Sequence, residues 1–283
     1  MPVASTKELV TAAMAGGYAV PAINVVNDLT MEAVLAAAEE SRSPIIVQTS
    51  VKTVRSIGLE VLKAMWDAMT VDVEVPVALH LDHCPDRDVI SACLAAGWNS
   101  VLFDAHELSV EENERQCIEV VAEARGHGAD VESEIEGIRG VEDGIGSDEE
   151  GPIQTLRVAV AFIEATEVDI FAPAIGNAHG MYKAKPQLDH QRITDLVEET
   201  GIPMALHGGT GLSPQQFSDL IARGCAKVNV STALKIAYME ANRSYLGDNP
   251  GAADPPKLFH DVREAVMEMT RTHIRLFGSE GRA

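Results

Sequence analysis

Eight short apolar segments alternate with segments of helical periodicity along this chain, and this alternation narrows its possible folds most. The strand-like segments are residues 19–25, 44–50, 75–82, 100–104, 130–134, 169–175, 203–206 and 226–230. Apolar residues recur with helical spacing in residues 5–15, ahead of the first strand, and then in residues 31–41, 58–69, 87–96, 111–126, 154–166, 191–200 and 214–222. Because a helical segment separates successive strands, the strands should run parallel with right-handed crossovers. Eight such units predict an α/β fold, a closed (β/α)8 barrel.

The chain is expected to form one domain. Its 283 residues suffice for one barrel, and no linker rich in Pro, Gly or Ser divides them. We expect residues 1–283 to form a single barrel domain with an N-terminal helix and a C-terminal helical extension. The alternative is a doubly wound open sheet, which ordinarily has fewer strands and a glycine-rich turn after the first. Val25-Val26-Asn27-Asp28 offers no such turn.

Charge and cysteine content exclude several function classes. A net charge of -21 repels nucleic acid and anionic lipid. No apolar run approaches the length of a membrane span, and the first 25 residues lack the pattern of a signal peptide. The four cysteines show neither CxxC spacing nor a disulfide-rich pattern. These observations predict a cytoplasmic protein without nucleic-acid or membrane partners.

Polar residues gather where the predicted strands end, which is where barrel enzymes carry their chemistry. In strand order they are Asn24, Ser50, Asp82 with His83, Asp104, Glu134, His179, His207, and Asn229 with Ser231. Neutral imidazoles suit zinc, and three protein ligands leave open the position that a catalytic metal needs. We expect His83, His179 and His207 to be the ligands. His80, which lies deeper, and His106 could support them without ligating the metal.

Three carboxylates accompany these histidines. Asp82 adjoins His83 but should point elsewhere because side chains alternate along a strand, so it could donate and accept protons beside the metal. A purely orienting role for Asp82 is the alternative. Asp104 and Glu134 end neighbouring strands, where they could bind a second, harder cation or hydrogen-bond the ligand histidines.

Two further segments indicate a phosphorylated substrate and an active-site loop. Gly208-Gly209-Thr210-Gly211 and Asn229-Val230-Ser231-Thr232 follow the last two strands, where barrels commonly bind phosphate through backbone N–H groups and helix N-termini. Lys183 could assist them. Residues 136–151 are rich in Gly, Asp and Glu and too long for a tight connection, which predicts a mobile loop at the active site.

Many short motifs, in the same order over nearly the whole chain, resemble the class II metal-dependent ketose-bisphosphate aldolases, which include fructose-bisphosphate and tagatose-bisphosphate aldolases. The motifs are Ala22-Ile23-Asn24-Val25, His80-Leu81-Asp82-His83, Phe103-Asp104-Ala105, Val131-Glu132-Ser133-Glu134, Glu142-Asp143-Gly144, Ala178-His179-Gly180-Met181-Tyr182, Leu206-His207-Gly208-Gly209-Thr210-Gly211, Lys227-Val228-Asn229-Val230-Ser231-Thr232 and Gly278-Ser279-Glu280-Gly281-Arg282.

The resemblance implies an aldolase that cleaves a phosphorylated ketose into dihydroxyacetone phosphate and an aldehyde. Zinc on the three histidines would stabilise the enediolate, and Asp82 would remove the C4 hydroxyl proton. Glu142 matches a family glutamate that exchanges the proton at the enediolate carbon. The ketone phosphate would lie near Gly180, Gly209, Thr210, Asn229, Ser231 and Thr232. Asp104 and Glu134 match acidic positions around the metal. Relatives are homodimers or homotetramers.

Departures from the family pattern bear on specificity. Lys52 and Arg55 lie in a segment where relatives often carry glycine, and they could read the substrate's far end. Glu136 and Arg139 stand where glycines are usual, His106-Glu107 replaces a serine-histidine pair, and Ser231 replaces a frequent aspartate.

Two other classes of function remain as alternatives. One is a zinc barrel hydrolase, which usually brings paired histidines from the first strand. The other is a sugar-phosphate-binding protein without turnover, which would have no use for Asp82.

Overall fold

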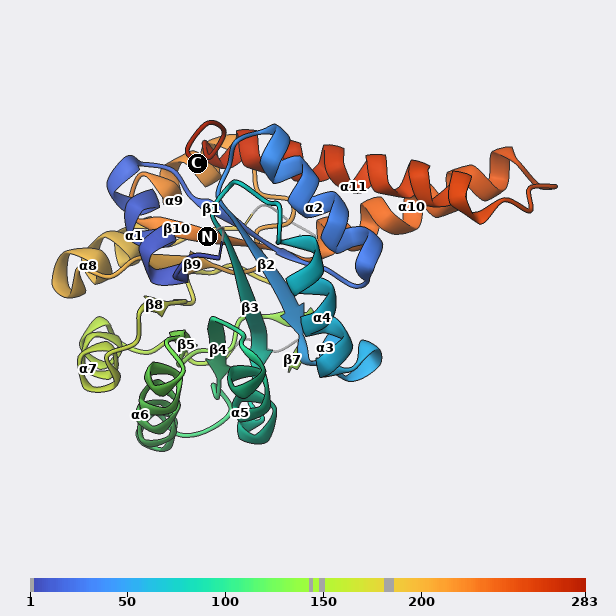
Figure 1. Ribbon diagram of the computed structural model, residues 1–283. Coiled ribbons are helices and arrows are strands. Elements are labelled where there is room, and N and C mark those ends of the chain that lie inside the picture. The colour runs from blue at the N-terminus through green and yellow to red at the C-terminus, as the bar shows by residue number, and fades with distance from the viewer. Residues whose placement is uncertain (1–2, 143–144, 148–150, 181–185) are drawn as a thin grey trace.

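The computed structural model confirms the closed barrel of eight parallel strands (Figure 1). It describes residues 3–142, 145–147, 151–180 and 186–283. The strand order around the barrel is β1-β10-β9-β8-β5-β4-β3-β2. The barrel strands are β1 (Val20–Asn24), β2 (Ile45–Ser50), β3 (Val77–Cys84), β4 (Ser100–Asp104), β5 (Asp130–Glu134), β8 (Ile170–Phe171), β9 (Met204–Leu206) and β10 (Cys225–Val230).

Helices surround the barrel, and most begin at a side-chain cap. Asn27, for example, forms a capping box with Thr30, so the second helix begins three residues earlier than residue 31. The helices are α1 (Thr6–Gly16), α2 (Asp28–Glu40), α3 (Val51–Ile57), α4 (Leu59–Met69), α5 (Arg87–Ala96), α6 (Val110–Gly126), α7 (Leu156–Thr166), α8 (His190–Thr200), α9 (Pro214–Ile221), α10 (Thr232–Asp248) and α11 (Pro255–Phe277). Among the described residues, none of these helices is long and apolar enough to cross a membrane.

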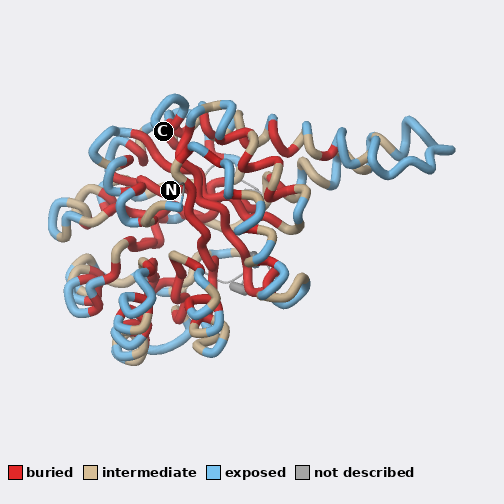
Figure 2. Tube along the Cα trace, viewed as in Figure 1, coloured by how far each residue is buried: buried red, intermediate tan, exposed pale blue. Residues whose placement is uncertain are grey.

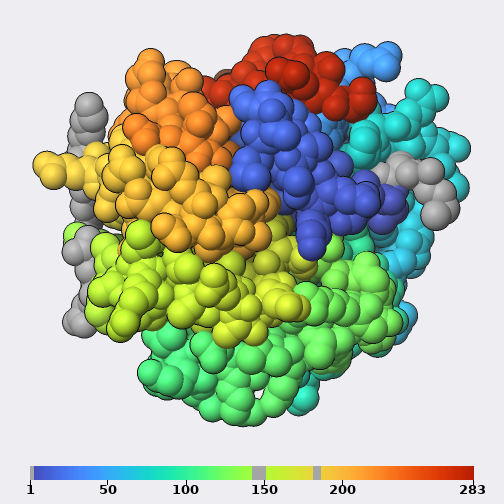
Figure 3. Space-filling model, turned by 90° about the vertical axis from the view of Figure 1, so that its left-hand side faces the viewer, coloured from blue at the N-terminus to red at the C-terminus, as the bar shows by residue number. Residues whose placement is uncertain are grey.

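The core has two layers, and the strands between them are buried (Figure 2). The larger layer lies between the barrel and its helices. The smaller one lies inside the barrel, where residues such as Ala22, Ile46 and Ala78 meet Leu9 and Val10 of α1. Helix α1 is tied to the starts of the strands, because Ser5 Oγ donates to Asp130 at 2.8 Å. Figure 3 shows this blue N-terminal segment bordered by the red C-terminal segment. The opposite end of the barrel, where the strands finish, carries the polar residues.

The predicted strand over residues 169–175 is wrong in length, because β8 ends at Phe171. Pro173 has no N–H to donate to a sheet, and the N–H of Ala174 donates to the Glu136 carboxylate at 2.8 Å instead. The segment that leads to His179 therefore leaves the barrel early and is held by a side chain.

Three elements were not expected from the sequence. Helix α3 follows β2 directly, with Ser50 as its N-cap. Within the segment 136–151, β6 (Gly140–Glu142) pairs antiparallel with β7 (Ile145–Ser147). The long α10 and α11 form an antiparallel hairpin whose far end stands clear of the barrel in Figure 1.

Candidate metal centre and active site

Three histidines, each in or after a different strand, lie close together at the carboxyl end of the barrel. His83 belongs to β3, His207 follows β9, and His179 lies in the segment after β8. The ring centroid of His83 lies 4.7 Å from that of His207 and 5.2 Å from that of His179. The rings of His179 and His207 are 6.5 Å apart. The structure thus brings the three predicted ligands close together, although the trio whose ligand atoms all lie within 4.8 Å of one another is His83, Glu134 and His207.

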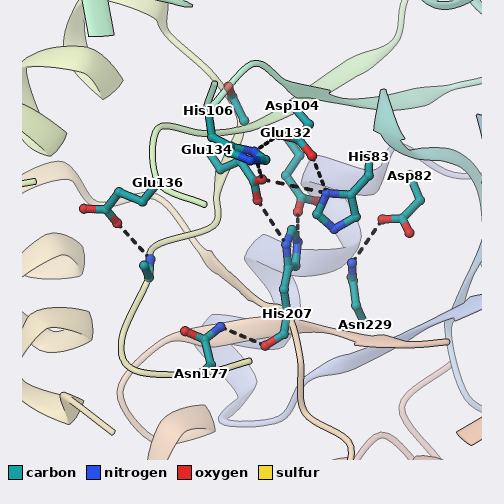
Figure 4. A network of polar contacts seen from close by, with 12 residues as sticks. Asp82, His83, Asp104, His106, Glu132, Glu134, Glu136, Asn177, His207 and Asn229 are labelled. Atoms are coloured by element: carbon teal, nitrogen blue, oxygen red, sulfur yellow. Dashed lines mark hydrogen bonds and ion pairs between the residues drawn. The ribbon is translucent and has the colours of Figure 1, made fainter. Parts of the chain in front are cut away.

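Carboxylates orient two of these imidazoles from behind (Figure 4). Asp104 Oδ2 lies 2.7 Å from His83 Nδ1, and Glu132 Oε1 lies 2.7 Å from His207 Nε2. Nε2 of His83 is therefore left to bind a cation, whereas Nδ1 of His207 lies 3.2 Å from Glu134 Oε2, so a cation there would be shared with that carboxylate. The buried Nε2 of His83 has no hydrogen-bond partner in the part of the chain that the structure describes. The donor set and its outer carboxylates fit a zinc ion.

Glu134 lies at the same point. Ligand atoms of His83, Glu134 and His207 all fall within 4.8 Å of one another. Burial lowers the pKa of His207, but hydrogen bonds to Glu132 and Glu134 outweigh it and raise the pKa to about 9. A cation bound to His207 would replace the proton at Nδ1. Glu132, at Nε2, would hold the imidazole in either state, whereas Glu134, at Nδ1, would share the bound cation.

Asp82 is held apart from the histidines by two amides. Its Oδ2 accepts from Asn24 Nδ2 at 2.7 Å, and its Oδ1 accepts from Asn229 Nδ2 at 3.1 Å. Gln48 in turn donates to Asn24 at 2.7 Å. Asp82 is buried at the carboxyl end of β3, and its two amide partners fix the orientation of its carboxylate. This is the arrangement that a group transferring a proton at a defined atom needs.

A backbone irregularity at the end of β3 separates Asp82 from His83. His83 has φ 41°, a left-handed conformation that is uncommon for a non-glycine residue, and the register with β4 shifts between Leu81 and Cys84. Such local strain costs about 1–3 kcal/mol and clusters at functional sites. The shift turns the imidazole toward Asp104 while Asp82 faces Asn24 and Asn229, so adjacent residues take different places in one site.

His106 forms a second group with Asp104 and Glu134. Its Nδ1 lies 2.5 Å from Asp104 Oδ1 and 3.4 Å from Glu134 Oε1. Ligand atoms of the three residues lie within 4.8 Å of one another. A Cβ at residue 137 would lie 2.7 Å from the His106 ring, so Gly137 makes room for the imidazole. His106 therefore belongs to the outer part of the metal centre.

The candidate phosphate site lies between the last two strands. A Cβ at Gly208 would come within 2.2 Å of Ala178 O, so this glycine lets the loop after β9 approach the segment that carries His179. Ser231 precedes α10, and its buried hydroxyl has no hydrogen-bond partner among the described residues. An unpaired buried hydroxyl beside the N-terminus of a 17-residue helix suits an anionic oxygen.

The other residues predicted to bind substrate or transfer protons lie at or after the ends of the strands, or outside the described part of the chain. Ser50 caps α3, and on that helix Lys52 is exposed while Arg55 pairs with Asp86 at 2.8 Å. Glu142 ends β6, but its side chain lies outside the described part, and Lys183 lies outside it altogether. Gly209 and Thr210 lie in the loop after β9, Thr232 is the first residue of α10, and Gly180 follows His179.

A buried ion pair that was not expected from the sequence lies below the metal centre. Lys227 and Glu132 are both fully buried, and Lys227 Nζ lies 2.8 Å from Glu132 Oε2. The same ammonium donates to Asn229 at 2.7 Å. Lys227 therefore links Glu132, which contacts His207, to Asn229, which donates to Asp82. Burial alone would raise the pKa of Glu132. The Lys227 ammonium and the hydrogen bond to His207 together outweigh burial and hold this pKa below its usual range.

We expect Lys227→Met to lower the free energy of unfolding by about 3–5 kcal/mol, because it leaves the Glu132 carboxylate buried without a counter-charge. Chemical denaturation would measure the loss. The double variant Lys227→Met, Glu132→Gln removes both charges of the pair and should recover part of the lost stability. Equal stability of the wild type and Lys227→Met would contradict the assignment of this pair.

Comparison with known proteins identifies the family. The family model described as "Fructose-bisphosphate aldolase class-II" matches residues 4–282. The chain belongs to the class II fructose-bisphosphate aldolase family. It is therefore an aldolase, a lyase that cleaves carbon–carbon bonds, and the metal dependence of the family agrees with the donor set at its rim.

Named relatives span the whole aldolase chain. It is 38% identical over 281 residues to a sulfofructosephosphate aldolase from Alkalicoccus urumqiensis, covering 99% of this chain and 98% of that one. It is 36% identical over 289 residues to a fructose-bisphosphate aldolase from Geobacillus stearothermophilus, covering 100% and 99%. Among solved structures, the YdjI aldolase of Escherichia coli K12 is 30% identical with a TM-score of 0.86, covering 99% of both chains.

Proposed function

We propose that this aldolase uses zinc, bound by His83, His179 and His207, to cleave a ketose that carries an anionic group at each end. The convergence of the three rings carries the assignment. Bound zinc would polarise the substrate's ketone and stabilise the negative charge that develops on the three-carbon fragment. A second cation beside it would be held by Asp104, Glu134 and His106, whose ligand atoms lie close together.

The proton transfers fall to residues of the chain. Asp82, fixed by Asn24 and Asn229, would remove the proton of the C4 hydroxyl as the C3–C4 bond breaks. The same carboxylate would return the proton to the aldehyde oxygen in the condensation direction. Glu142 is our candidate for proton exchange at the carbon of the three-carbon product. The loop 208–210 and residues 229–232, with Gly180 and Lys183, would bind the phosphate of that product.

The far end of the substrate is proposed to meet Lys52 and Arg55. Both are cations on α3, beside the rim. The relatives at 38% and 36% identity are named for a sulfofructose phosphate and for fructose bisphosphate, which differ in the anion at this end. The test is to compare kcat/KM for fructose 1,6-bisphosphate, tagatose 1,6-bisphosphate and 6-sulfofructose 1-phosphate. Triose-phosphate release from none of them, at full metal loading, would refute the proposed substrate class.

We also propose that the enzyme is a cytoplasmic homo-oligomer, with chains meeting at the α10–α11 hairpin. Ile236, Met239, Leu246 and Phe259 on this hairpin are 38–53% exposed, and Figure 2 shows the exposure of its far end. All four cysteines are buried as free thiols, which suits a reducing compartment. An apolar surface on a projecting element is typical of a subunit interface.

The hairpin proposal predicts a particle of at least twice the 30.3 kDa chain mass in sedimentation. Met239→Asp with Phe259→Asp should shift it to the mass of one chain, because two buried carboxylates would oppose association. Val71→Asp, at an exposed apolar residue away from the hairpin, is the matched control and should leave the mass unchanged. An oligomer that survives the hairpin changes would place the interface elsewhere.

A further inference from the structure

Glu136 is a charged side chain that the chemistry above does not use. It stands at the start of the segment after β5, where resembling aldolases usually carry glycine. The structure buries it, with 2% of the residue exposed. Figure 4 shows its carboxylate turned away from His83 and His207. A residue that read the substrate would face the rim, so the position of Glu136 calls for another role.

Three donors surround the Glu136 carboxylate. Oε1 accepts from Arg192 Nη2 at 2.6 Å and from the backbone N–H of Gln154 at 2.7 Å. Oε2 accepts from the backbone N–H of Ala174 at 2.8 Å. Arg192 Nη1 also donates to the carbonyl of Gln154 at 2.8 Å, so the ion pair holds both backbone groups of one residue. Both charges are compensated inside the protein, as buried charges must be.

These contacts join three segments at the edge of the metal centre. Glu136 and Gln154 lie near the two ends of the connection between β5 and α7, and Arg192 lies in α8. Ala174 lies just past β8, on the path to His179. A second contact holds the same segment, because the His179 N–H donates to Arg139 O at 2.8 Å. A Cβ at Gly140 would come within 2.7 Å of His179 O, which shows how closely the two segments pack.

We propose that Glu136 and Arg192 are positioning residues, which hold the segment 136–140 against residues 174–179 and so fix the metal ligand His179. The proposal rests on the zinc assignment above. Beyond that assignment, it makes Glu136 a support of the metal centre and removes it from substrate recognition. Beyond Ala172, whose N–H still donates to Ser133 O of β5, the backbone that leads to His179 has left the barrel sheet, so side-chain contacts of this kind help to hold it in place.

The test compares Glu136→Gln with the wild type in three measurements. Zinc affinity and kcat should each fall about tenfold or more, as is typical when an outer-shell partner of a metal ligand is lost. KM for the ketose should change less than twofold. Backbone amides of Ala174 and His179 should exchange hydrogen faster, and this readout does not depend on activity. Glu167→Gln, which removes an exposed ion pair with Arg125, is the control and should match the wild type.

Glu136→Gln leaves Arg192 without its counter-charge and could unfold the chain. The double variant Glu136→Gln, Arg192→Met removes both charges, and it should fold and show the same losses. Unchanged zinc affinity and amide exchange in a folded variant would overturn the proposal. A rise confined to KM would overturn it as well, and would return Glu136 to substrate binding. A wild-type enzyme that binds no zinc would instead refute the proposed metal, while faster exchange in the variant would still support the clamp.

Discussion

Replacing Asp82 with asparagine should leave the metal bound while turnover falls about a hundredfold or more, the usual cost of losing a general acid–base group. Asparagine keeps the shape of the side chain but cannot take the C4 hydroxyl proton. It also places an NH2 group against the amide donors of Asn24 or Asn229, which now both donate to the carboxylate. The measurement is kcat at saturating ketose, together with zinc per chain by elemental analysis.

Asp67→Asn is the matched control for that variant. Asp67 is an exposed aspartate of α4 that pairs only locally with Lys63, so the same chemical change there should leave kcat unaltered. Loss of zinc from Asp82→Asn would mean that Asp82 supports the metal. Unaltered turnover would remove Asp82 from proton transfer.

Replacing His179 with alanine should abolish both zinc binding and cleavage while leaving the fold intact. The side chain is only half-buried and lies in a loop outside the barrel sheet, so its loss disturbs little packing. Removing one of three imidazoles leaves too few ligands to hold a catalytic zinc. Zinc per chain, triose-phosphate release and the circular dichroism spectrum together test this expectation.

His127→Ala provides the control for His179, because His127 is exposed at the end of α6, away from the rim. It should bind zinc and turn over as the wild type does. Cleavage by His179→Ala in metal-free buffer would contradict the assigned ligand set.

Periodicity predicted the barrel because each strand lies between two apolar layers and each helix buries one face. The prediction failed where tertiary contacts outweigh that pattern. Residues 172–175 are apolar and strand-like, yet Pro173 and the Glu136 carboxylate end β8 at Phe171. Helix α3 was missed because Ser50 completes a strand and caps a helix at once.

For the site, the sequence pointed to the residues at the strand ends, and the layer beneath them was overlooked. Lys227 and Glu132 lie two residues before Asn229 and Glu134, so strand alternation places each pair on one face. A lone lysine or glutamate in an apolar strand is usually expected to reach solvent. Only the barrel's closure shows that these two meet across its interior at 2.8 Å. The same alternation, continued inward from the rim, would have suggested them.

The most direct test of the central claim is to strip the enzyme of metal and titrate zinc back while following triose-phosphate release from a cleavable ketose. The account predicts no cleavage by the stripped enzyme and activity that rises in proportion to zinc, reaching its plateau at about one catalytic ion per chain. Full cleavage by metal-free enzyme, or zinc binding that restores none, would contradict it.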